Sequence, residues 1–169
     1  MNSSFIALIA NIALTISVIV AVIFGIAQVR SAARDRRERL TLDILSSFQT
    51  KEFAEMLHHT TFTKFPATRG EWLKMEPQDQ IRFVQFTQQM ESLGLLLAER
   101  LINIDLVDKT LGAYVVHMWE KCKPVILDTR ITNDDPFLSE YFQWMAEQID
   151  RRMKERPRKP FHLSSRTAI

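Results

Sequence analysis

The spacing of apolar residues changes after the first thirty positions of the chain. Phe5–Val29 is one stretch of apolar and uncharged residues in which no Lys, Arg, Asp or Glu occurs. As an α-helix at about 1.5 Å per residue, this stretch spans roughly 37 Å, enough to cross the roughly 30 Å hydrocarbon core of a bilayer. A cleaved secretory signal is disfavoured, because Met1–Ser4 carries no basic residue and the apolar stretch is too long. The pattern predicts a transmembrane helix.

Beyond residue 40, apolar residues recur at the spacing of amphipathic helices, with polar residues between them. Pro77 suits a first helical position, Asp105 suits an N-cap, and Asp135 followed by Pro136 gives another start signal. Pro124 is expected to kink its helix, because proline lacks a backbone donor. The expected elements are Leu40–Phe65 with a break within Ser46–Thr50, a loop marked by Pro66 and Gly70, and helices over Gln78–Ile102, Leu106–Cys122, Val125–Ile131 and Phe137–Glu155. The predicted fold is all-α: one N-terminal transmembrane helix followed by a small antiparallel helical bundle.

Arginines gather directly after the apolar stretch, and none precedes it. The positive-inside rule therefore places the N-terminus outside and the rest of the chain in the cytoplasm. The predicted organisation is a transmembrane helix (5–29), a cytoplasmic helical domain (30–156) and a disordered basic tail (157–169). The basic residues expected at the membrane surface are Arg30, Arg34, Arg36, Arg37 and Arg39.

Four small residues are spaced by four along the apolar stretch: Ala13, Ser17, Ala21 and Gly25. Such a stripe lets two helix backbones approach closely within a membrane. It favours a protein partner, or a second copy of this chain, packed against the transmembrane helix. Chance is the alternative, because Ala and Gly are common in such helices.

Two short patterns raise the possibility of a metal site. Glu55 and His58, one turn apart, resemble half of a di-iron carboxylate site, which helical bundles can host. His117 and Glu120 repeat the pattern in reverse order, and Glu91 is a further candidate ligand. Surface-exposed polar residues explain the same positions, so a membrane-bound metalloenzyme is kept as the alternative function.

Cys122 is the single cysteine, which excludes an intramolecular disulfide. Its neighbours Lys121 and Lys123 could favour a thiolate, although an unreactive thiol is the default interpretation. No phosphate-binding loop, nucleophile elbow or zinc spacing is found in the sequence.

A second basic run lies near the C-terminus. It suits either a solvated helix end or a patch that meets anionic lipid. Nucleic acid is disfavoured, because no aromatic residues interleave the run and the net charge of the chain is only +2. The run consists of Arg151, Arg152, Lys154, Arg156, Arg158 and Lys159.

Several short motifs follow one another from Glu91 onward. They are Glu91-Ser92-Leu93-Gly94, Leu101-Ile102, Asp105-Leu106-Val107, Gly112, Trp119-Glu120, Pro124-Val125-Ile126 and Arg130. In this layout the chain resembles a family of uncharacterised bacterial single-pass membrane proteins with a cytoplasmic helical domain. The resemblance implies the same architecture and a place in the bacterial inner membrane, and it supplies no catalytic residue.

Together these patterns predict a membrane-tethered interaction, accessory-subunit or regulatory protein. We expect it to have no catalytic activity and no cofactor. Its expected partners are the lipid bilayer and a protein, or a second copy, reached through the transmembrane helix.

Overall fold

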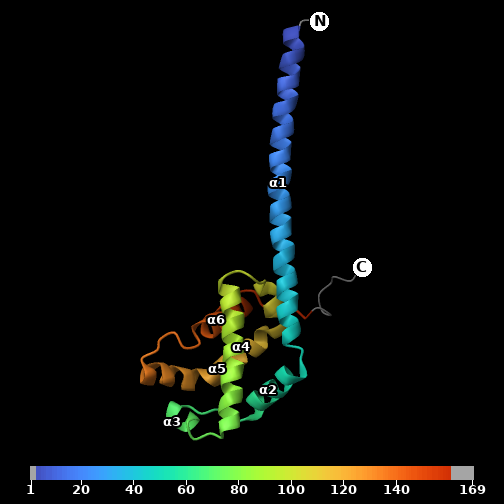
Figure 1. The fold of residues 1–169 in the computed structure, drawn as a ribbon. Coiled ribbons are helices and arrows are strands. Elements are labelled where there is room, and N and C mark those ends of the chain that lie inside the picture. The colour runs from blue at the N-terminus through green and yellow to red at the C-terminus, as the bar shows by residue number, and fades with distance from the viewer. Residues whose placement is uncertain (1–2, 161–169) are drawn as a thin grey trace. The chain divides into compact units, whose positions relative to one another are not determined.

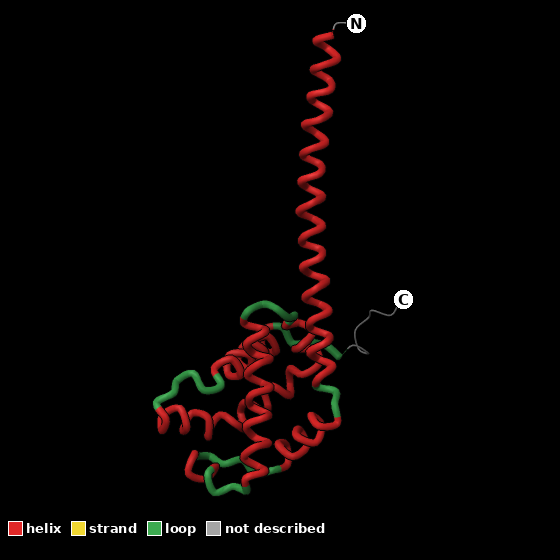
Figure 2. Tube along the Cα trace, in the orientation of Figure 1, coloured by secondary structure: helices red, strands yellow, loops and turns green. Residues whose placement is uncertain are grey.

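The computed structural model describes residues 3–160, and these residues form helices and connecting loops without any strand (Figures 1 and 2). The all-α prediction is confirmed. The chain divides into two compact units, one ending at Leu40 and the other beginning at Thr41. The helices are α1 (Ser3–Ser47), α2 (Lys51–Phe62), α3 (Arg69–Trp72), α4 (Pro77–Ala98), α5 (Ile104–Asn133) and α6 (Glu140–Glu155).

Helix α1 begins in the apolar stretch and runs without interruption to Ser47. Within the apolar stretch the hydroxyls of Thr15 and Ser17 donate to the carbonyls of Asn11 and Ala13, each over 2.8 Å. These bonds satisfy the polar groups inside the helix itself, as an apolar environment requires. The helix is long and apolar enough to span a membrane.

The core of the second unit lies among α4, α5 and α6. Phe86 and Met90 from α4, Met118 from α5 and Phe142 from α6 are fully buried. Trp119 of α5 meets the ring of Phe142 edge-on, with 5.3 Å between ring centroids. Burying large apolar side chains of this kind stabilises the fold by about 1.5–3 kcal/mol each. Helix α6 is therefore held by both α4 and α5.

Two glycines allow α6 to approach its neighbours closely. A Cβ placed on Gly94 of α4 would overlap the backbone carbonyl of Tyr141 at the start of α6. A Cβ on Gly112 of α5 would lie 3.0 Å from the side chain of Met153 and 3.2 Å from that of Ile149, both in α6. Both contacts are tighter than ordinary van der Waals packing, so the absence of a side chain sets the helix spacing here.

Several expected helix ends need correction. Helix α5 begins at Ile104 because Asn103, not Asp105, is the N-cap, and the Asn103 side chain accepts the Asp105 backbone N–H over 2.8 Å. Helix α5 then continues through Pro124 to Asn133 as one helix, where two segments were expected.

The other corrections concern the turns. Helix α4 ends at Ala98, and α6 begins at Glu140 rather than Phe137. The short helix α3 was not anticipated. The break within Ser46–Thr50 and the start of α4 at Pro77 are confirmed. Pro157–Pro160 lies outside any helix, and the remainder of the expected disordered tail, 161–169, lies outside the described residues.

Candidate interaction surfaces

The start of α6 is capped by a side chain from another helix. Both carboxylate oxygens of Glu91 in α4 accept backbone N–H groups, from Tyr141 over 3.1 Å and from Phe142 over 2.8 Å. The first N–H groups of a helix have no partner within it, and a carboxylate also suits its positive end. Ser139, which occupies the N-cap position, has left-handed backbone geometry with φ of 57° and makes no side-chain cap. Glu91 therefore does what an N-cap serine usually does.

The connection between α5 and α6 is held by Arg130. Its Nε donates to the Leu138 carbonyl over 2.9 Å, and its Nη1 donates to the side-chain carbonyl of Gln143 over 2.7 Å. Together with the Glu91 cap, these bonds fix how α6 starts. Glu91, Gly94 and Arg130 all belong to the motifs that carried the family resemblance, and the structure gives each of them a role in positioning α6.

Beside this junction lies a cavity of about 420 Å³, here called the tryptophan cavity. Its apolar wall comes from α3, α4, α5 and the loop before α6, through Trp72, Phe83, Val84, Val125, Ile126 and Leu138. Its polar lining residues are Arg69, Thr87, Gln88, Glu91, Thr129, Asn133 and Ser139. Small-molecule sites typically enclose roughly 300–1,000 Å³ and are mostly apolar with a few polar groups, so this cavity has a suitable size and lining.

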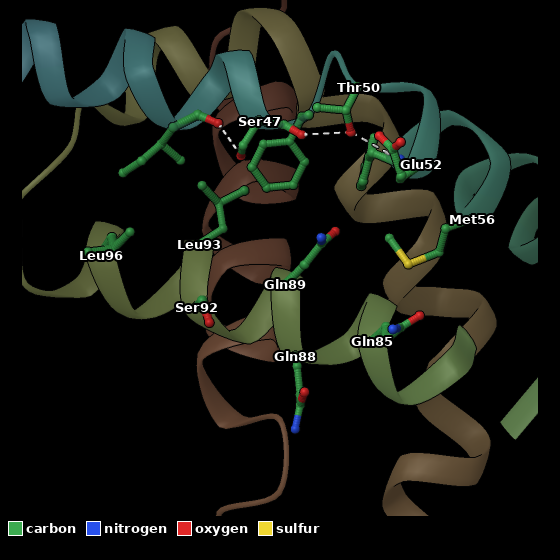
Figure 3. A pocket seen from close by; sticks show the side chains of 13 residues that line it. Ser47, Thr50, Glu52, Met56, Gln85, Gln88, Gln89, Ser92, Leu93 and Leu96 are labelled. Atoms are coloured by element: carbon green, nitrogen blue, oxygen red, sulfur yellow. Dashed lines mark hydrogen bonds between the residues drawn. The ribbon is translucent and has the colours of Figure 1, made fainter. Parts of the chain in front are cut away.

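A second hollow of about 450 Å³, here called the glutamine groove, lies between α4 and the segment that joins α1 to α2 (Figure 3). Gln89 and Leu93 lie on the side of α4 that faces Ser47 and Thr50 in Figure 3. The groove combines apolar residues (Ile44, Phe48, Phe53, Met56, Leu93, Leu96) with uncharged polar ones (Ser47, Thr50, Gln85, Gln88, Gln89, Ser92) and Glu52. It offers a surface for another protein segment more readily than for a charged ligand.

The five candidate metal ligands have separate surroundings. Glu91 caps α6, Glu55 pairs with Lys51 over 3.4 Å, and Glu120 pairs with Lys123 over 3.7 Å. The ring of His58 lies against Phe62, with 4.6 Å between centroids, and His117 is exposed. Among residues 3–160 there is no group of three or more His, Cys, Asp or Glu residues that could hold a metal ion.

Of the two interpretations of Cys122, the structure supports the unreactive thiol. Cys122 is fully buried, and burial raises the pKa of its thiol to about 12, outweighing the opposing effect of Lys121. The Lys121 ammonium instead donates to the carbonyls of Thr60 and Thr61, over 2.6 and 2.5 Å. Desolvation lowers the pKa of Lys121. A cation at the C-terminal end of α2 is favourable, so Lys121 ties α2 to α5.

Part of the C-terminal basic run is used inside the domain. Arg152 pairs with Asp105 near the start of α5. Arg158 donates to the Asp108 carbonyl over 3.0 Å, and its guanidinium lies 3.4 Å from the buried Asp108 carboxylate. These contacts give the run a structural role beside the two interpretations that the sequence left open.

The sequence did not point to Trp72, Arg69 or Ser139 as members of one site. They come from a four-residue helix and a loop separated by about 70 positions, and the cavity forms only when α4 and α5 bring these segments together.

The stripe of small residues in α1 is exposed, and a Cβ on Gly25 would meet nothing within 4 Å.

Comparison with protein families finds a match to a domain of unknown function (DUF4760) over residues 15–149. The matched segment includes the second part of the apolar stretch of α1 and the helical unit as far as Ile149, within α6. Comparisons with curated proteins and with solved structures give no match.

Proposed function

The chain belongs to the family of that domain of unknown function (DUF4760). We propose that the protein is a membrane-anchored accessory or regulatory protein without catalytic activity. In this proposal α1 crosses the bilayer once, and the helical unit that begins at Thr41 binds a protein partner.

The observation that carries the proposal is the exposure of large apolar side chains all around the first part of α1. Val20 is 44% exposed and Phe24 is 70% exposed, and the large apolar residues between Phe5 and Val29 all fall within or near this range. Soluble proteins rarely expose apolar patches larger than a few hundred Å². A bilayer removes this surface from water, at roughly 25 cal/mol per Å².

The arginines that follow the apolar stretch support an orientation with the N-terminus outside and the helical unit in the cytoplasm, in the inner membrane of a bacterium. Arg34 forms an exposed ion pair with Glu38 over 3.0 Å, which helps α1 to continue as a helix beyond the bilayer. The five cations of the cluster suit the anionic surface of a cytoplasmic leaflet; they are Arg30, Arg34, Arg36, Arg37 and Arg39.

A binding role for the helical unit is supported by its surface. The glutamine groove is lined by apolar side chains, uncharged polar groups and one carboxylate, that of Glu52, a composition suited to a protein segment. Exposed apolar residues also occur on its helices, including Ile81 (51%) on α4 and Ile131 (83%) on α5. The anchor would restrict such a partner to the membrane or its surface.

Affinity purification of the full-length protein from native membranes, extracted with a mild detergent, tests this proposal. A partner of fixed stoichiometry should co-purify, and it should be lost when Gln85 and Gln89 in the glutamine groove are replaced by Lys. The matched control replaces Gln148 of α6, which lines neither hollow. If the protein purifies without a partner although its abundance in the membrane is normal, the result would contradict an accessory role.

A further inference from the structure

The tryptophan cavity carries hydrogen-bond donors that the described part of the protein leaves without acceptors. The indole Nε1 of Trp72, a residue that lines the cavity, is buried, and no residue among 3–160 accepts a hydrogen bond from it. Leaving a buried donor unpaired costs free energy. The atoms that cover this nitrogen must shift slightly before an acceptor in the cavity can reach it.

Ser139 provides a second donor at the same cavity. Only 8% of Ser139 is exposed, and its hydroxyl forms no hydrogen bond with another described residue. Its usual partners, the first N–H groups of α6, are already taken by Glu91. The capping arrangement thus leaves the Ser139 hydroxyl without an acceptor among residues 3–160, at the wall of an apolar cavity.

Arg69 provides the positive charge. It lies three residues before Trp72 in α3, a spacing that puts both side chains on one face of a helical turn, and both line the cavity. Its backbone N–H donates to the Asp128 carboxylate over 2.7 Å, whereas its guanidinium forms no ion pair with a carboxylate of residues 3–160. The carboxylate of Glu91 also lines the cavity, and two N–H groups together with the positive end of α6 offset its charge.

We propose that the tryptophan cavity binds an aliphatic carboxylate of the fatty-acid class. The apolar wall formed by Phe83, Val84, Val125 and Ile126 accommodates the chain. The two carboxylate oxygens have enough lone pairs to accept from Trp72, Ser139 and Arg69 together. This ligand site goes beyond the proposed anchoring role and does not depend on it.

Octanoate is a suitable probe, because it dissolves in water as a monomer. Equilibrium dialysis with radiolabelled octanoate would use the full-length protein in phosphatidylcholine nanodiscs, with binding to empty nanodiscs subtracted. We expect saturable binding of one octanoate per protein, with octanol at least tenfold weaker because only the carboxylate pairs with Arg69. No saturable binding, or equal binding of octanol, would overturn the proposal.

Substitutions locate the site. Arg69→Gln should weaken octanoate binding about tenfold, and Trp72→Phe and Ser139→Ala about three- to tenfold each. The matched controls Arg151→Gln, Trp144→Phe and Ser46→Ala change residues that line neither hollow and should leave binding unchanged. Controls that weaken binding as much as the cavity variants would refute the assignment. Octanoate should also raise the melting temperature of the wild-type protein, a readout that needs no variant.

Discussion

Phenylalanine has opposite surroundings in α1 and α6. Phe24 of α1 is 70% exposed, whereas Phe142 of α6 is fully buried. In α6 the apolar residues form one face, which packs against α4 and α5, and the polar residues form the other. The apolar stretch of α1 has no charged face to offer to water. The comparison shows that the distribution of apolar residues around a helix, rather than their number, indicates the solvent that the helix requires.

The largest expected effect comes from replacing a glycine by alanine, a change that can be made both in the helical unit and in the apolar stretch of α1. Gly94→Ala should destabilise the helical unit by about 3 kcal/mol or more, because its Cβ would overlap the Tyr141 carbonyl and push α6 away from α4. Gly25→Ala should leave stability unchanged, because nothing lies within 4 Å of that position. Urea unfolding of the full-length protein in detergent, followed by circular dichroism, measures both. Equal effects of the two variants would mean that α4 and α6 do not cross closely at Gly94.

Removal of the apolar helix tests whether the helical unit is stable without it. We expect residues 41–160 to fold alone in water as a helical monomer with a cooperative thermal transition, because the core of that unit is formed by its own helices. Circular dichroism and analytical ultracentrifugation check this expectation. A chain that is helical but melts without cooperativity would show that the apolar helix or a partner completes the core.

The cap on α6 should have a smaller effect. Glu91→Ala leaves the N–H groups of Tyr141 and Phe142 without their acceptor and should cost about 1–3 kcal/mol of unfolding free energy. Glu55→Ala is the matched control, since its exposed ion pair with Lys51 contributes about 0.5 kcal/mol or less. Urea unfolding of residues 41–160 distinguishes the two. If the Glu91 variant is as stable as the control variant, the Glu91 carboxylate does not stabilise the start of α6.

These effects also show what the sequence could predict. The helical conformation of the apolar stretch, the break within Ser46–Thr50 and the helix start at Pro77 depend on local signals, and all three predictions are confirmed. The role of Glu91 depends on a contact with residues 50 positions away, which the sequence read along one helix cannot reveal.

The local signal was misleading at Asp105. Asp105 looked like an N-cap, but Asn103, two residues earlier, takes that role, and its side chain accepts the Asp105 backbone N–H. At Cys122 the default interpretation of an unreactive thiol agrees with the structure, because burial affects the pKa of the thiol more than Lys121 does. The sequence alone left this open, because burial depends on tertiary packing.

The smallest effect is expected for the stripe of small residues, which concerns association rather than folding. Replacing Ala21 and Gly25 by Ile keeps the helix apolar but fills the stripe, so close packing on another helix should be lost. Membrane abundance should stay the same, whereas cross-linking or co-purification of the partner should fall. Replacing Ile19 and Ile23 by Leu, away from the stripe, is the control. If the stripe variant cross-links as well as the wild-type protein at equal membrane abundance, the four-residue spacing of the small residues is a coincidence.

The central claim, a single-pass anchor with a cytoplasmic helical domain, is tested most directly by reporters fused to the C-terminus of the full-length chain. A fluorescent protein that folds only in the cytoplasm should be bright in the membrane fraction, and a phosphatase that is active only outside should be silent. Replacing the arginine cluster at Arg30, Arg34, Arg36, Arg37 and Arg39 by Gln should weaken this difference, because the cluster sets the orientation. An active phosphatase, or a bright fusion released into the soluble fraction, would contradict the account.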